Sequence, residues 1–290
     1  MKTVSDVPQG IIESNTGPTA SWVNGQPADR ISIFDRGLTY GDGVFETIRV
    51  NTAPVLLSLH LARLARGTKV LSIPVDFQFL KQEINRFLAG RSQGILKIVI
   101  TRGEGGRGYA PPQEPSSSRI LSWHSLTTYP ESHSLLGVNL FDCETTLAQG
   151  GRLAGIKHLN RLEQVLARSE WGLKNFQEGL VCDDEERIVE AVFSNILMVK
   201  NGELHTPGLA KAGVSGVMRE WLLNRLSGEG VTVMEREIPK KEIYTMDEVF
   251  LSNSVFGVWP VRSFGSITWA PGPVTKLSQR LISNELMNDA

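Results

Sequence analysis

Apolar residues recur at helical spacing in two segments of the first half of the chain. Within residues 58–73, leucine and valine positions fall roughly three or four residues apart, as on one face of a helix. A stronger stripe over residues 77–88 follows Asp76, whose side chain is a typical N-cap, and precedes Gly90, a typical stop. We therefore predict two helices here. A third apolar helical face is predicted within residues 159–166.

Strand patterns lie between and after these helices. Residues 95–100 form a β-branched run interrupted by a single lysine, Lys97, which is typical of a core strand. The Asn-Gly pair at positions 24 and 25 predicts a tight hairpin at the start of the folded chain. A second Asn-Gly pair, at positions 201 and 202, predicts another hairpin. The mixture of both patterns indicates an α/β (α+β) fold.

The polar stretches divide this fold into two expected domains. Residues 1–20 are expected to be a loose N-terminal leader, followed by a small N-terminal α/β domain over residues 21–127. A polar linker over residues 128–134 then leads to a larger C-terminal domain over residues 135–290. Residues 103–118 are rich in glycine, proline and serine, and they predict a long loop of the kind that often carries function.

Composition narrows the range of functions. Because 30 basic residues are balanced by 31 acidic ones, no broad field exists to hold nucleic acid or an anionic membrane, and a small-molecule substrate is favoured. Cys143 and Cys182 stand far apart, which argues against a disulfide framework or a structural zinc site and fits a reducing cytoplasm. The first twenty residues have no long apolar block typical of a signal peptide or a membrane span.

Two ionisable residues are candidates for chemistry. Lys157 stands at the expected junction of a strand end and a helix, where a side chain can point into a cleft; a solvated lysine near a helix start is the ordinary alternative. Glu190 lies in an apolar, strand-like stretch, where a buried carboxylate needs a partner such as a protonated ring nitrogen. A strand-end glutamate that faces water or pairs with an arginine is the alternative for Glu190.

A third candidate is a site for an anion. The glycine-rich residues 213–219 lead directly into an apolar helix, so backbone N–H groups at its start are free to bind a phosphate. An ordinary capped helix is the alternative. The polar triplet at residues 252–254 offers further donors, as does Arg63 on the first helix, although a lone arginine is usually a surface residue.

Taken in order, these segments resemble the fold-type IV pyridoxal-phosphate enzymes, which include branched-chain and D-amino-acid aminotransferases and 4-amino-4-deoxychorismate lyases. The resemblance covers essentially the whole chain after residue 21. Its further marks are Asp-Arg-Gly-Leu-Thr-Tyr-Gly-Asp-Gly-Val-Phe-Glu-Thr at residues 35–47 and His-Leu-Ala-Arg-Leu at residues 60–64. The resemblance implies two α/β domains with pyridoxal 5'-phosphate at their interface, and a homodimer.

The resemblance also implies roles for individual residues. Lys157 would carry the cofactor as a Schiff base, Glu190 would contact the pyridine nitrogen, and Asn195 would lie near the cofactor. The phosphate would be bound by residues from three segments: Arg63, then Gly216, Val217 and Met218, then Asn253 and Ser254. No metal is implied.

Within the family, residues 101–109 and 155–164 are most similar to the lyases that act on 4-amino-4-deoxychorismate. D-Amino-acid aminotransferases tend to have Arg-x-His where this chain has Arg107-Gly108-Tyr109, and branched-chain enzymes usually have a tyrosine where Arg161 stands. The resemblance then implies substrate contacts by Lys97 and Arg107, with Tyr109 nearby; a lysine that snorkels from a strand edge is the alternative for Lys97.

The expected reaction converts 4-amino-4-deoxychorismate to 4-aminobenzoate and pyruvate in folate biosynthesis. An aminotransferase of the same fold, acting on D-amino or branched-chain amino acids, is the first alternative, because a shared fold does not settle the reaction. A non-catalytic binding protein on the same scaffold is the second.

Overall fold

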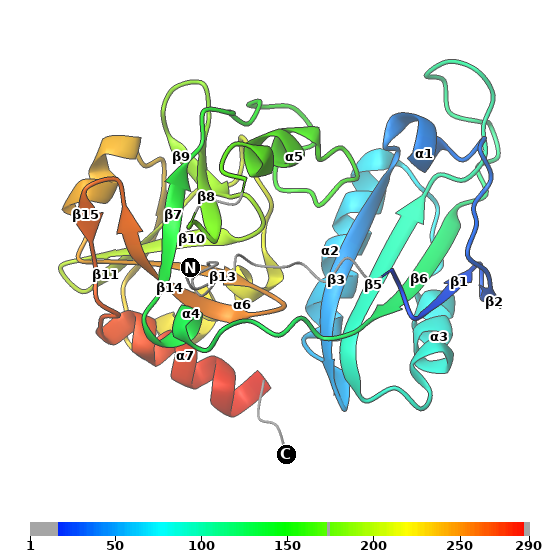
Figure 1. The fold of residues 1–290 in the computed structure, drawn as a ribbon. Coiled ribbons are helices and arrows are strands. Elements are labelled where there is room, and N and C mark those ends of the chain that lie inside the picture. Colours follow the sequence, from blue (N-terminus) through cyan, green and yellow to red (C-terminus); the bar gives the residue numbers. More distant parts are fainter. Residues whose placement is uncertain (1–16, 173–174, 287–290) are drawn as a thin grey trace, which may run out of the picture.

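The computed structural model describes residues 17–172 and 175–286, and it contains two β-sheets side by side (Figure 1). The first is a six-stranded antiparallel sheet in the order β2-β1-β6-β5-β3-β4. Its strands are β1 (Ala20–Val23), β2 (Gln26–Pro27), β3 (Gly43–Asn51), β4 (Ala53–Pro54), β5 (Gln93–Thr101) and β6 (Ser118–His124). The hairpin predicted at Asn24 and Gly25 is confirmed as the β1–β2 turn.

Helices α2 (Leu57–Leu71) and α3 (Phe77–Leu88) cover one face of this sheet, and the short α1 (Arg36–Tyr40) lies at one end of it (Figure 1). The two predicted helices are thus confirmed within a few residues. The Asp76 side chain caps α3 by accepting from the backbone N–H groups of Gln78 and Phe79. The stripes of α2 and α3 meet the inward residues of β3, β5 and β6 in one core. Alternation along the strands therefore leaves the second face more polar.

The second face of the small sheet borders the other sheet. It carries the half-buried side chains of Phe45, Arg49 and Lys97. Nη1 of Arg49 donates a hydrogen bond to the carbonyl of Val255, 3.3 Å away, in a turn of the second sheet. The lysine that interrupts the predicted core strand thus points away from the core.

The second sheet has nine strands and is mixed. Eight follow the order β12-β11-β10-β13-β14-β7-β8-β9, and β15 pairs with β14. Its strands are β7 (Val138–Asp142), β8 (Glu178–Cys182), β9 (Ile188–Ala191), β10 (Asn195–Lys200), β11 (Glu203–Pro207), β12 (Val233–Arg236), β13 (Glu248–Asn253), β14 (Gly257–Phe264) and β15 (Ile267–Thr268). The hairpin predicted at Asn201 and Gly202 is confirmed as the β10–β11 turn.

Helices α6 (Val217–Gly228) and α7 (Pro273–Leu286) pack on one face of this sheet, and a second apolar core fills the other face. Three shorter helices complete it: α4 (Ser132–Leu135), α5 (Leu162–Ser169) and the 3-10 helix η1 (Lys240–Thr245). The apolar face predicted around residues 159–166 exists on α5, but Leu162, Val165 and Leu166 are exposed. That face is therefore not part of the core of this chain.

The mixed α/β fold is confirmed. The domain boundaries remain a prediction, although the two sheets divide between β6 and β7, and α4 begins inside the expected linker. Most of the expected leader, residues 1–16, lies outside the described residues, and β1 already begins at Ala20. Within the described part of the chain, no helix is long and apolar enough to cross a membrane.

Candidate active site

Lys157 lies on a segment that is hydrogen-bonded to both halves of the molecule. On one side, the backbone N–H of Phe45 donates to the Lys157 carbonyl (3.0 Å), and Leu159 donates to Gly43 (3.0 Å). On the other side, the Gly155 N–H donates to Gly213 (2.9 Å). Gly155 has a φ of +74°, which a residue with a Cβ adopts only with strain. The backbone itself thus places Lys157 at the junction of the two sheets.

The side chains of Lys157 and Lys97 meet at one aromatic ring. Nζ of Lys157 lies 4.4 Å from the centre of the Phe45 ring, and Nζ of Lys97 lies 5.6 Å from it. Burial lowers the pKa of Lys157 to about 7, and the nearby charge of Arg63 adds to this effect. A large fraction of Lys157 is therefore a neutral, nucleophilic amine near neutral pH.

Glu190 is a buried carboxylate, only 5% exposed, at the edge of the second sheet. Its described hydrogen-bond partners are neutral: Oε2 accepts from the Val214 N–H (2.8 Å), and the Gln164 side chain also bonds to it. Burial raises the pKa of Glu190 because the charged form is poorly solvated there. The charges of Arg161 and Lys157 partly oppose this effect. A buried carboxylate of this kind suits a protonated ring nitrogen, which would be a further positive partner.

The segment that leads into α6 contains Gly216, Val217 and Met218, which are part of the predicted phosphate site. Helix α6 begins after Gly216, and no side chain caps its first turn, which contains the buried Val217 and Met218. Nδ2 of Asn195 donates to the Val214 carbonyl (2.9 Å). A Cβ at position 216 would lie 1.8 Å from Oδ1 of Asn195, so glycine is required. Free N–H groups at a helix start attract an anion.

Arg63 is held at this segment by a buried charge network. Nη1 of Arg63 donates to the Ser215 carbonyl (3.1 Å), while Nε and Nη2 bind the two carboxylate oxygens of Glu46 at 2.7 and 2.5 Å. His60 Nδ1 lies 2.6 Å from Glu46 as well. Burial alone would raise the pKa of Glu46, but the charge and hydrogen bonds of Arg63 lower it to about 2. Glu46 therefore stays ionised and fixes the guanidinium.

Glu46 and His60 were not among the predicted site residues. Both lie inside the segments that carried the family resemblance, and Glu46 occupies a core-facing position of β3, where a carboxylate is unusual. A carboxylate at this core-facing position was the signal from which Glu46 could have been predicted. Their pairing with Arg63 could not be read from the sequence because it joins β3 to α2.

The turn between β13 and β14 carries Asn253 and Ser254. Oδ1 of Asn253 accepts from the N–H groups of Val255 and Phe256, and its Nδ2 donates to the Phe193 carbonyl (3.3 Å). The side chain thus shapes the turn. Phosphate binding by Asn253 and Ser254 stays a prediction.

Arg107 and Tyr109 lie on the loop between β5 and β6, which projects at the outer end of the small sheet (Figure 1). Tyr109 is 87% exposed, and its ring centre lies 5.6 Å from that of Tyr40. The structure therefore brings Lys97, but not this loop, to Lys157 within one chain. The roles of Arg107 and Tyr109 in substrate binding stay a prediction.

This exposed loop is nevertheless fastened by a buried arginine, Arg36. Its guanidinium donates to the carbonyls of Gly108 (3.2 Å), Tyr109 (3.1 Å) and Ala110 (3.4 Å). Its Nε binds Asp42 at 2.9 Å, and Asp42 is also held by Arg102. One buried cation thus orders three consecutive peptide groups next to Arg107.

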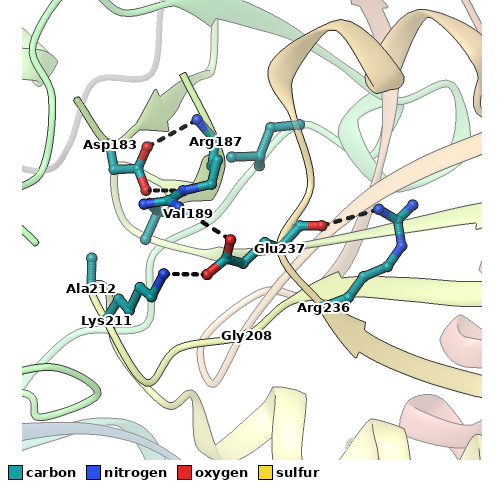
Figure 2. Close-up of a pocket in the computed structure, with 9 residues that line it drawn as sticks. Asp183, Arg187, Val189, Gly208, Lys211, Ala212, Arg236 and Glu237 are labelled. Carbon is teal, nitrogen blue, oxygen red and sulfur yellow. Dashed lines mark hydrogen bonds and ion pairs between the residues drawn. The ribbon is translucent and has the colours of Figure 1, made fainter. Parts of the chain in front are cut away.

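A network of ion pairs includes Lys211, two residues before Gly213 (Figure 2). Arg187 pairs with Asp183 (2.8 Å) and Glu237 (3.1 Å), and Glu237 also pairs with Lys211 (2.5 Å). The cavity among them measures about 20 Å³, which holds a single water molecule at most. Through Glu237, the network links Lys211 to Arg187, the residue directly before β9, which carries Glu190.

Comparison with known proteins gives the family of this chain. Residues 43–264 match the model of amino-transferase class IV. The chain belongs to this family. It is 35% identical over 271 residues to the aminodeoxychorismate lyase of Vibrio harveyi, covering 91% of this chain and 98% of that protein. It is 26% identical over 271 residues to the D-alanine aminotransferase of Bacillus licheniformis, covering 89% and 93%.

Among solved structures, the 4-amino-4-deoxychorismate lyase of Pseudomonas aeruginosa superimposes with a TM-score of 0.90 at 50% identity, covering 92% of this chain and 99% of that one. An Escherichia coli branched-chain aminotransferase reaches 0.85 at 24% identity, which shows the shared fold. The chain is therefore similar both to lyases and to aminotransferases.

The class IV site fits pyridoxal phosphate. Lys157 offers an amine for the aldehyde, Glu190 a carboxylate for the ring nitrogen, and Arg63 with the uncapped α6 start a cradle for the phosphate. Among the described residues, no group of three or more His, Cys, Asp or Glu is arranged to hold a metal ion.

We expect Arg36→Met to loosen the loop beside Arg107 without unfolding the protein. Loss of its hydrogen bonds from a charged group should raise trypsin cleavage after Arg107 by about ten- to a hundredfold, since proteolysis follows local opening. Cleavage is measured from fragment masses over time. Arg30→Met, at an exposed arginine on the same side, is the matched control. An unchanged cleavage rate in folded Arg36→Met would show that the loop is ordered by other contacts.

Proposed function

We propose that this class IV protein converts 4-amino-4-deoxychorismate to 4-aminobenzoate and pyruvate, a step of folate biosynthesis. The observation that carries the proposal is the contact of Lys157 and Lys97 with the same Phe45 ring. One place in the molecule therefore offers both an amine for the cofactor and a cation for a substrate carboxylate. The likeness to two lyases over almost the whole chain supports this choice over transamination.

In this proposal, Lys157 holds pyridoxal phosphate, Glu190 faces its ring nitrogen, and Arg63 with the amides of Val217 and Met218 binds its phosphate. When bound, the cofactor withdraws electrons from the substrate carbon that bears the amine. The buried charge of Glu190 keeps a proton on the ring nitrogen. Asn195 supports the phosphate cradle by fixing the Val214 carbonyl.

Lys157 would also move the proton. When it is not bound to the cofactor, its Nζ would be a free base: burial lowers the pKa of Lys157 to about 7, which suits proton transfer at neutral pH. Nζ takes the proton from the ring carbon that bears the amine, and the enolpyruvyl group leaves as the ring becomes aromatic. A proton delivered to the departing enolpyruvate gives pyruvate. 4-Aminobenzoate is the second product, and Lys157 would hold the cofactor between turnovers.

The substrate carries two carboxylates, which would be bound by Lys97 and Arg107. Lys97 contacts the same Phe45 ring as Lys157, whereas Arg107 lies on an exposed loop of the same chain. An arginine can hold a carboxylate through two parallel hydrogen bonds. A homodimer in which the loop of one protomer reaches the cleft of the other would unite the two cations, with Tyr109 beside them.

Exposed apolar side chains support the homodimer. One group lies on α5, directly after the Lys157 segment, and comprises Leu162, Val165 and Leu166. A second group, Ile33, Phe34 and Leu38, lies beside the loop of Arg107, since Gly105 donates to the Phe34 carbonyl. Contiguous exposed apolar surface is typical of an interface.

The free, buried cysteines and the balanced charge support a cytoplasmic location.

The deciding experiment supplies the cofactor-loaded protein with 4-amino-4-deoxychorismate and no keto acid. We expect equal amounts of 4-aminobenzoate and pyruvate. Turnover that requires added 2-oxoglutarate would favour an aminotransferase, and no turnover in either assay would favour a binding protein.

Glu190→Gln should bind the cofactor yet be at least about 100-fold slower in the same assay, because an amide cannot stabilise the ring's positive charge as a carboxylate does.

The carboxylate contacts have their own test. Lys97→Met and Arg107→Met should each lower kcat/KM by roughly one to two powers of ten, as expected when a charge-assisted hydrogen bond is lost, while the absorption of the bound cofactor is unchanged. Steady-state kinetics on 4-amino-4-deoxychorismate measure the effect. Lys81→Met, an exposed lysine on α3, is the control. Full lyase activity in both variants would remove these residues from the substrate site.

A further inference from the structure

The side chain of Arg161 binds the main chain on both sides of Lys157. Its Nε donates to the His158 carbonyl (2.9 Å), and its Nη2 donates to the Ile156 carbonyl (2.7 Å). The carbonyl of Lys157 itself accepts from the Phe45 N–H on the opposite edge (3.0 Å). Three consecutive carbonyls are thus fixed, so both peptide planes next to Lys157 are set.

These bonds determine where the Lys157 side chain points. The direction of a Cα–Cβ bond follows from the two peptide planes that flank it. The segment has no helix or strand of its own at Lys157, because α5 begins only at Leu162. Arg161 therefore supplies the order that regular secondary structure would supply elsewhere.

The environment of Arg161 shows that this arrangement is costly. Burial lowers the pKa of Arg161, and the charge of Glu190 partly opposes that effect. Its described hydrogen-bond partners are main-chain carbonyls rather than a carboxylate. The planar guanidinium of an arginine carries donor nitrogens that can reach two carbonyls two residues apart. The ammonium of a lysine has only one nitrogen from which to donate.

We propose that Arg161 is a positioning residue for Lys157, which orients the lysine through the Ile156 and His158 carbonyls and places a fixed positive charge beside it. The proposal rests on the proposed role of Lys157. It gives Arg161 a function of its own, at the position where branched-chain enzymes usually carry a tyrosine.

The charge of Arg161 acts on Lys157 together with its other neighbours. After burial, Arg63 and Arg161 lower the pKa of Lys157, whereas Glu46 and Glu190 raise it. His60 on α2 and Lys97 on β5 are further ionisable groups near Lys157. Because Arg161 favours the neutral amine, its removal should raise the pKa of Lys157.

The test uses the full-length protein without cofactor or substrate, so its outcome does not depend on the proposed reaction. Acetic anhydride labels neutral amines, and peptide mass spectrometry follows labelling of Lys157 from pH 5 to pH 10. We expect a midpoint near pH 7 in the wild type, a higher midpoint in Arg161→Met, and a wild-type midpoint in Arg161→Lys, which keeps the charge. Arg152→Met, at an exposed arginine of the same segment, should behave as wild type.

Hydrogen exchange separates the orienting bonds from the charge. Exchange of the Phe45 amide, which donates to Lys157, should be about tenfold faster in both Arg161→Met and Arg161→Lys and unchanged in Arg152→Met. The proposal is overturned if folded Arg161→Met keeps both the wild-type midpoint of Lys157 labelling and the wild-type exchange rate of the Phe45 amide. If that variant does not fold, unchanged exchange in Arg161→Lys overturns it. If these results are as expected but the lyase assay fails, the proposed reaction is wrong and the role of Arg161 stands.

Discussion

The backbone hydrogen bonds that join residues 155–159 to both sheets are the constraint on which the site depends. They bind this segment to β3 on one side and to the start of the α6 region on the other. Lys157 is thereby carried against Phe45 of the small sheet, although Glu190 and the anion-binding segment belong to the large one. Neither half of the molecule contains the site alone, so correct docking of the two sheets creates it.

Charge balance is the second consequence of this junction. Burying an ionised group costs free energy unless its neighbours compensate. Glu46 and Arg63 compensate each other directly, and both also act on Lys157. Glu190 is different because its hydrogen bonds come from neutral groups, while the positive charges of Arg161 and Lys157 act on it from a distance. The junction thus combines one directly hydrogen-bonded ion pair, Glu46 with Arg63, and one buried carboxylate without a directly bonded cation among the described residues.

Sequence patterns predicted the local elements well and the long-range contacts poorly. The helix after Asp76 and the Asn-Gly hairpins were predictable because their signals lie within a few residues. Lys157, Glu190 and Arg63 stood out in the sequence and Asn195 came from the family resemblance, and the structure brings Arg63 and Glu190 near Lys157. The Glu46 partnership, the bonds of Arg161 and the anchor of Arg36 join distant elements, which periodicity cannot reveal. The exposed face of α5 was unpredictable because an apolar helical stripe does not say whether its partner is this chain or another.

The most direct test of the account asks which lysine holds the cofactor. The protein loaded with pyridoxal phosphate is treated with borohydride, which makes the carbon–nitrogen bond to the lysine permanent, and is then digested and mapped by mass spectrometry. We expect the added phosphopyridoxyl mass on the peptide that contains Lys157, together with loss of the visible absorption band. The same mass on the peptide of another lysine, or no added mass at all, would contradict the account.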